Sequence, residues 1–171
     1  FITANSFRRD WDQLKSFFWQ FYWRAPALKP GTMVISNELP FNYYTDNSLT
    51  APLNWMYAPV YTRADLPYML LYTEKRLGGV TLPSLEKDTS ITYPYRTVNF
   101  NSSTSNVVVI YMPKNGCLRV LDPERGHANI YDNIADSFTQ AIPLSDPSRI
   151  LVNSAQPAQP MFFPEPKPNW C

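Results

Sequence analysis

Hydrophobic positions near the start of the chain repeat with the period of an α-helix. Successive residues placed about 100° apart bring seven apolar side chains to one helix face: Phe7, Trp11, Leu14, Phe18, Phe21, Tyr22 and Ala25. The polar residues between them, including Ser16 and Gln20, fall outside this face. We therefore predict a long helix with a buried aromatic face. Asn5 or Ser6 can cap its start, and it should end before Pro26, which disfavours helical geometry at the preceding residue.

Two apolar segments with a short helix between them predict a pair of parallel strands. Residues 32–36 follow Gly31 and are typical of a strand, and residues 68–73 are typical of a second one. A helix over about residues 51–57 lies between them, provided that Pro52 falls in its first turn. This order predicts a βαβ unit, whose two strands run parallel.

The pattern changes to strands and turns in the second half. Residues 95–101 alternate weakly, and residues 106–112 form a nearly continuous β-branched run, which is typical of a central strand covered on both faces. A tight turn at residues 114–116 returns the chain into residues 117–121. We expect three antiparallel strands here.

A third helix is predicted over residues 128–140, where Ile130, Ile134 and Phe138 recur every four residues. Residues 150–152 are a candidate edge strand. The whole pattern predicts an α/β fold: a single domain over residues 1–153, with a mixed β-sheet of about five or six strands on which the N-terminal amphipathic helix and two further helices pack. Residues 154–171 are rich in proline and are expected to form an extended tail.

Charge and hydropathy exclude some classes of partner. The chain has 15 basic and 14 acidic residues, so it lacks the excess of cations that binds nucleic acid. No apolar run approaches the roughly 20 residues that span a bilayer, and no signal peptide is recognisable. The chain starts without methionine and stops after a proline-rich run. We expect a piece of a longer protein, the alternative being a trimmed soluble one.

Motifs for catalysis, metal or cofactor binding are not found. His127 is the one histidine, and the simplest interpretation is an exposed loop residue. A metal site formed with its acidic neighbours is conceivable but lacks a recognised ligand spacing: Asp122, Glu124, His127 and Asp132. We therefore predict no catalytic residue, no metal and no cofactor in this chain.

The two cysteines, Cys117 and Cys171, are expected to be free thiols. They would pair only if the chain folds outside the cytoplasm.

The loop after the first predicted strand is the best candidate for a ligand site. In open α/β sheets, crevices form beyond the carboxyl ends of the strands. This loop carries carboxylates, amides and aromatic rings, the groups that bind the hydroxyls and the apolar faces of sugars: Glu38, Asn42, Tyr43, Tyr44, Asp46 and Asn47. The alternative is that these residues cap the next helix and pack over the sheet edge.

Trp19 and Trp23 lie opposite the apolar face of the first helix. Indole rings favour protein contacts and membrane interfaces. We expect these two residues to form an interaction surface, or to be buried under the proline-rich tail.

Four segments resemble the extracytoplasmic domain of large bacterial multi-spanning membrane proteins, some of them glycosyltransferase-like: RRDW, FFWQFYWRAPALKPGT, DNSLTAPLNWMYAP and CLRVLDPE. The resemblance implies a location on the outer side of the cell membrane, with the transmembrane part of the same protein and the membrane surface as partners. It attaches no catalytic role to any of these residues. Any acidic catalytic groups would be expected in the membrane part.

These observations lead to three hypotheses of function. The first is a non-catalytic extracytoplasmic domain that positions an acceptor, such as a glycan or a lipid-linked sugar, or braces the membrane part. The second is a small carbohydrate-binding or carbohydrate-active domain that uses Glu38 and Asp46. The third is an oligomerisation module that associates through Trp19 and Trp23.

Overall fold

The computed structural model describes residues 2–42, 44, 46–60, 64–74, 81–114, 116–125 and 134–153, with the backbone alone for residues 2, 3, 46 and 47. These residues form three α-helices and seven β-strands: α1 (Ile2–Arg24), β1 (Thr32–Ser36), α2 (Asp46–Tyr57), β2 (Asp65–Leu66), β3 (Tyr68–Tyr72), β4 (Ser90–Tyr95), β5 (Val98–Ser103), β6 (Val107–Tyr111), β7 (Arg119–Val120) and α3 (Asp136–Ala141). Two 3-10 turns follow α3, at Ile142–Leu144 and Pro147–Arg149.

The central sheet has four strands in the order β3-β1-β6-β7. Strand β1 pairs in parallel with both β3 and β6, and β7 runs antiparallel to β6. The predicted βαβ unit, β1-α2-β3, is thus confirmed. A second sheet has the order β2-β5-β4. The predicted α/β fold with mixed strand directions is confirmed, and the strands are divided between two sheets.

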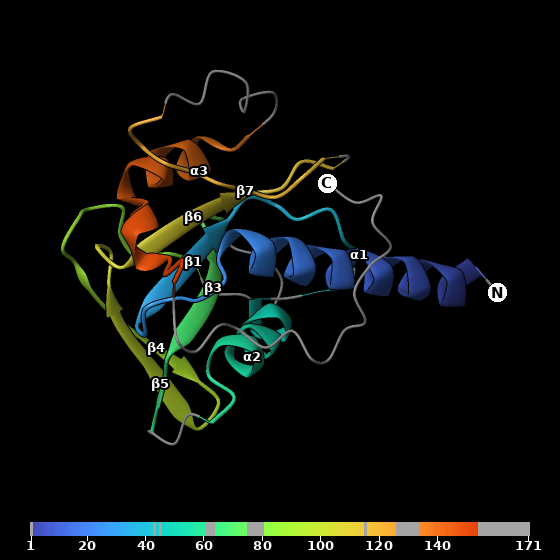
Figure 1. Cartoon of the computed structure of the whole chain (residues 1–171), viewed down its shortest axis with the longest axis horizontal. Coiled ribbons are helices and arrows are strands. Elements are labelled where there is room, and N and C mark those ends of the chain that lie inside the picture. The colour runs from blue at the N-terminus through green and yellow to red at the C-terminus, as the bar shows by residue number, and fades with distance from the viewer. Residues whose placement is uncertain are drawn as a thin grey trace.

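Helices α1 and α2 cover one face of the central sheet, and the second sheet and α3 cover the other (Figure 1). Side chains alternate along a strand, so a strand that is apolar throughout contributes to two cores. Val34, Leu70 and Val108 pack with α1 and α2 in one core. Their neighbours Met33 and Met69 pack in the other core, with residues of β4, β5 and α3. The predicted central strand over residues 106–112 is therefore confirmed as β6, covered on both faces.

The buried face of α1 differs from the predicted one. Phe18 and Phe21 are fully buried as expected, whereas Phe7 and Trp11 are 51% and 50% exposed. The first half of α1 runs beyond the edge of the sheet, so only its second half has a layer to pack against (Figure 1). There Phe17, which was not among the residues predicted for the apolar face, is fully buried against Phe18 and Phe21.

Two polar residues of α1 that were expected outside the apolar face are also buried. Gln20 donates through Nε2 to Ser16 Oγ at 3.0 Å. Its Oε1 accepts the backbone N–H of Leu118 at 2.7 Å. These bonds satisfy the amide within the core and tie α1 to the segment that enters β7.

The segment around residue 96 is a hairpin where one strand was predicted. β4 and β5 are antiparallel, and Arg96 between them has a φ of 55°. The chain then leaves this hairpin, and β6 inserts beside β1. The expected run of three antiparallel strands is therefore wrong, because β6 pairs in parallel with β1 and does not pair with β5. The antiparallel return from β6 into β7 is confirmed.

Three smaller predictions also need correction or fall outside the described residues. Pro52 lies inside α2, which begins at Asp46, and not in its first turn. Ile150 forms an isolated bridge with Leu28 instead of starting an edge strand. The helix predicted over residues 128–140 is present in the described residues as α3, which begins at Asp136. Residues 126–133 and the predicted tail from residue 154 lie outside the described residues.

Candidate functional site

A cleft of about 1180 Å³ lies at the carboxyl ends of the parallel strands. The last residues of β1, β3 and β6, which are Ser36, Tyr72 and Tyr111, all line it. Strand β3, the next of this sheet along the chain, lies on one side of β1, and β6 lies on its other side. The strand order therefore reverses at β1. Ligands of open α/β sheets bind at such a position.

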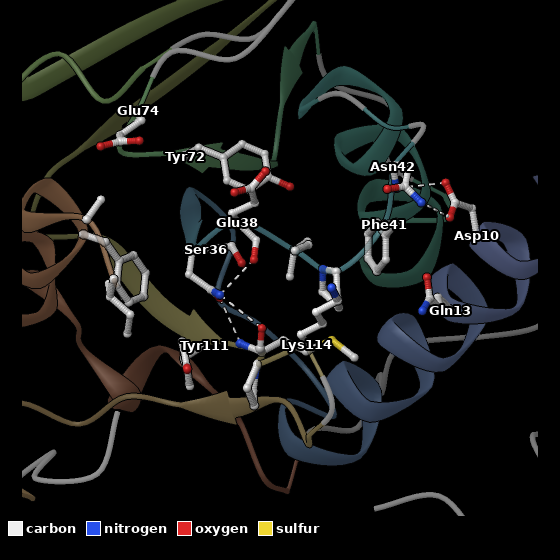
Figure 2. A pocket seen from close by; sticks show the side chains of 18 of the residues that line it. Asp10, Gln13, Ser36, Glu38, Phe41, Asn42, Tyr72, Glu74, Tyr111 and Lys114 are labelled. Carbon is white, nitrogen blue, oxygen red and sulfur yellow. Dashed lines mark hydrogen bonds between the residues drawn. The ribbon is translucent and has the colours of Figure 1, made fainter. Parts of the chain in front are cut away.

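Most of the cleft wall is polar. Strand ends, the loop after β1 and the first half of α1 contribute these groups: Arg9, Asp10, Gln13, Ser36, Asn37, Glu38, Asn42, Thr73, Glu74 and Lys114. Figure 2 shows Glu38, Tyr72 and Glu74 toward one end of the cleft, and Asp10, Asn42 and Gln13 toward the other. Tyr111, which is half-buried, adds aromatic surface beside these groups, and the buried ring of Phe138 packs behind it with 6.4 Å between the ring centroids.

Asn37 fixes the start of the loop after β1. Its Oδ1 accepts the backbone N–H of Met112 at 2.9 Å, and its Nδ2 donates to the Met112 carbonyl at 3.0 Å. The side chain thereby continues the β1–β6 ladder in place of a backbone residue. The main chain is free to turn away at Glu38, which carries that carboxylate to the cleft.

Asp10 fixes the far end of the same loop. Its carboxylate accepts the backbone N–H of Asn42 at 2.9 Å and the Asn42 side-chain Nδ2 at 3.1 Å (Figure 2). Hydrogen bonds to a charged acceptor are stronger than neutral ones. The loop over residues 37–42 is therefore held at both ends, by β6 and by α1.

The Ser36 hydroxyl lies at the floor of the cleft. The residue is 1% exposed, and within the described part of the chain Ser36 Oγ has no hydrogen-bond partner. A buried hydroxyl normally has a partner in the protein or in ordered water. The hydroxyl is itself out of reach of solvent, so it is an unsatisfied polar group under the cleft and not a contact surface for a ligand.

Charges of both signs face the cleft. Glu38 and Glu74 are exposed carboxylates, and Arg9 and Lys114 are exposed cations. Among the described ion pairs, none involves Glu74, Arg9 or Lys114. Carboxylates and amides in a cleft with aromatic walls form hydrogen bonds to hydroxyls and cover apolar C–H surface.

The residues predicted for this site divide into three groups. Glu38 lines the cleft. Tyr44 supports the loop instead: its hydroxyl bonds the backbone N–H and carbonyl of Leu39, both at 2.9 Å, and its ring packs 4.6 Å from that of Phe41. Tyr43 and the side chains of Asp46 and Asn47 lie outside the described residues.

Trp19 and Trp23 lie side by side on α1, as their spacing predicted. Their ring centroids are 5.9 Å apart. Trp19 is half-buried and packs against the first core, whereas Trp23 is 42% exposed. The interaction surface at these two residues stays a prediction.

Cys117 corrects the expectation of free thiols, because it is disulfide-bonded. The other cysteine of the chain is Cys171.

The conceivable metal site includes His127 and Asp132, which lie outside the described residues. Asp122 accepts the backbone N–H of Glu124 at 3.0 Å and pairs with Arg125 at 3.3 Å. No group of three or more potential ligand side chains is placed to hold a metal ion in the described ranges.

Sequence reasoning missed Ser36, Tyr72, Glu74 and Lys114. Each of them lies at or just after the carboxyl end of one of the three parallel strands, β1, β3 or β6. The signal was present for Glu74, because the parallel β1–β3 pair was predicted. It was absent for Lys114, because β6 was expected in an antiparallel group.

A scan against protein-family models and searches of curated proteins and solved structures found no match to the chain. Within the described ranges, no helix has both the length and the apolar character needed to cross a bilayer. The cleft itself therefore provides the evidence of function.

Proposed function

We propose that this chain is an extracytoplasmic domain of a multi-spanning membrane protein, and that it holds a carbohydrate acceptor in the cleft without performing the chemistry itself. The cleft at the carboxyl edge of β3, β1 and β6 is the observation that carries the proposal. In this reading the reaction, of a glycosyltransferase-like kind, takes place in the transmembrane part of the same protein. The domain presents the acceptor to it from the outer side of the cell membrane.

The shape and chemistry of the cleft support a saccharide ligand. Its volume of about 1180 Å³ slightly exceeds the range of roughly 300–1,000 Å³ that is typical of small-molecule sites, so more than one sugar ring has room. The exposed carboxylates of Glu38 and Glu74 offer hydrogen bonds to hydroxyl groups. The half-buried ring of Tyr111 offers an apolar face for the C–H side of a pyranose.

The disulfide supports the extracytoplasmic part of the proposal. Structural disulfides persist in oxidising compartments and are rare in the cytosol of mesophiles. A bonded Cys117 therefore agrees with folding on the outer side of the membrane. The near balance of charge, 15 basic against 14 acidic residues, agrees with a neutral ligand better than with a polyanion.

Saturation-transfer NMR against a panel of neutral mono- and oligosaccharides tests the ligand. We expect transfer to at least one glycan, and its loss or a strong decrease in Glu38→Gln. The matched control is Glu86→Gln, because Glu86 is an exposed glutamate that does not line the cleft. Absence of transfer from every glycan, or equal effects of the two variants, would contradict the proposal. The gene that encodes this domain tests the membrane part of the proposal. If it encodes no membrane-spanning helix, that part is contradicted.

A carbohydrate-active enzyme is the second candidate function, favoured by the two exposed carboxylates of the cleft, Glu38 and Glu74. Glycoside hydrolysis commonly uses a pair of acidic residues that flank the scissile bond. Glu38 and Glu74 both line the cleft, at the ends of neighbouring strands β1 and β3. This candidate predicts that the domain releases nitrophenol from a nitrophenyl glycoside. Glu38→Gln and Glu74→Gln should each abolish this release. Binding without any turnover would favour the first function.

A further inference from the structure

The half-buried Cys117 lies beside the second half of α1. Its neighbour Leu118 is fully buried in the first core, and the Leu118 backbone N–H donates to Gln20 Oε1 at 2.7 Å. This bond fixes the main chain next to Cys117 at one turn of the helix. Cys117 is disulfide-bonded and the chain has two cysteines, so a bond within the chain joins it to Cys171. The disulfide therefore brings the end of the proline-rich tail to this place on α1.

The tail also starts close to α1. The Leu151 N–H donates to the Ala27 carbonyl at 2.9 Å. The Lys29 N–H donates to the Arg149 carbonyl, also at 2.9 Å. Residues 149–151, just before the tail, are thereby fixed along the stretch of chain that directly follows the helix.

The two anchors of the tail flank a short part of α1. From Gln20 to Ala27 the chain advances about 10 Å, because most of this stretch is helical and a helix rises 1.5 Å per residue. Residues 154–170 reach about 50 Å as polyproline II, at 3.1 Å per residue. The tail is therefore several times longer than the distance along α1, and it has the length to fold over the surface between its anchors.

Trp23 lies between the two anchors. It follows Gln20 by three positions, and residues three apart are neighbours on a helix surface. Its ring is 42% exposed and lies 5.9 Å from the ring of Trp19. Proline-rich segments bind aromatic surfaces in the polyproline II form, because their backbone is already extended before binding and loses little conformational entropy. The tail has five prolines, at positions 157, 160, 164, 166 and 168.

We propose that the indole pair, Trp19 and Trp23, is the docking surface for the proline-rich tail of the same chain, which the Cys117–Cys171 disulfide closes over α1. The inference is independent of the saccharide cleft. Attachment at both ends makes the docking intramolecular, with an effective concentration in the millimolar range. A contact too weak to form between separate molecules is then occupied. Opening the disulfide frees one end, so the tail should leave the indole rings.

Tryptic digestion without reduction tests the disulfide first. Cleavage after Lys114, Arg119 and Arg149 should release residues 115–119 linked to residues 150–171. A disulfide-linked pair of identical peptides would place the bond between two chains and overturn the proposal.

Fluorine NMR of the full chain labelled with 5-fluorotryptophan then tests the docking. A soluble gadolinium chelate broadens the signal of each ring according to its exposure, and replacing each tryptophan with phenylalanine assigns the five signals. A docked proline covers one of the two faces of an indole, so the gadolinium effect on Trp23 should about double in Cys171→Ser. The effect on Trp55, which is 57% exposed on α2, should stay unchanged.

A second variant separates docking by the prolines from the disulfide itself. It keeps both cysteines and should raise the gadolinium effect on Trp23 in the same way: Pro164→Ala, Pro166→Ala and Pro168→Ala combined. Circular dichroism confirms that each variant is folded. An unchanged effect on Trp23 in either variant would overturn the proposal. A change at Trp11 or Trp55 in place of Trp23 would overturn it too, because the tail would then lie elsewhere.

Discussion

Replacing Asn37 with alanine should destabilise the domain far more than its position at the end of a strand indicates. The side chain bonds both backbone groups of Met112, and Met112 is 6% exposed. Alanine removes both bonds and provides no substitute. The N–H and the carbonyl of Met112 would then have to find water at the margin of the cleft.

The magnitude follows from the number of bonds lost. A typical intramolecular hydrogen bond contributes about 1 kcal/mol net, and a buried group left without a partner costs about 1–3 kcal/mol. Two groups of Met112 are affected, and the cleft admits some water to them. We therefore expect Asn37→Ala to lower the free energy of unfolding by about 2–3 kcal/mol.

Urea unfolding followed by circular dichroism measures this change, with Asn101→Ala as the control. Asn101 lies exposed on β5. Its side-chain Oδ1 accepts a hydrogen bond from the hydroxyl of Thr92 at 3.0 Å, and Thr92 is exposed as well. Its replacement should change stability by about 0.5 kcal/mol or less. The reasoning is refuted if Asn37→Ala costs no more than Asn101→Ala, because Asn37 would then not extend the sheet.

Three further predictions concern the core, the pH dependence and the disulfide. Phe17→Ala should cost about 3–5 kcal/mol in the same urea assay, because the ring is fully buried; a cost below about 1 kcal/mol would contradict the packing of α1. Burial raises the pKa of the Tyr57 phenol well above its usual value. The unfolded chain loses this proton near pH 10 while the folded chain keeps it, so stability should fall as the pH rises above about 10. Tyr57→Phe should make this fall shallower, and an unchanged slope would contradict the assignment. Alkylation and mass spectrometry of the oxidised protein should find no free thiol at Cys117 before reduction and one after it; labelling before reduction would show that the disulfide is absent.

Much of the central sheet could be predicted because its three parallel strands, β1, β3 and β6, are largely apolar. Residues 32–36, 68–72 and 107–110 are buried on both faces, and the apolar pattern is visible without knowing their partners. The partner of β6 could not be predicted, because pairing with β1 joins residues far apart in the chain. Local pattern identified β1, β3 and β6 but not the β4–β5 hairpin, and long-range packing decided the sheet in which each strand lies.

Local pattern and long-range packing also explain how far the helix face and the cleft could be predicted. Periodicity gives the spacing of apolar residues on α1 but not the length of sheet that covers them, so the exposure of Phe7 and Trp11 was missed. Glu38 was found because it follows β1 directly along the chain. Lys114 reaches the same cleft only through the parallel arrangement of β6 beside β1.

Mapping of a bound glycoside on the backbone amides tests the central claim most directly. In a ¹H–¹⁵N correlation spectrum titrated with a glycoside that shows saturation transfer, we predict shifts concentrated at the cleft, namely at Ser36, Glu38, Thr73 and Lys114. The amides of β4 and β5, on the second sheet, should stay unchanged. Shifts confined to that second sheet or to the surface around Trp23, with none at the carboxyl ends of β1, β3 and β6, would contradict the account.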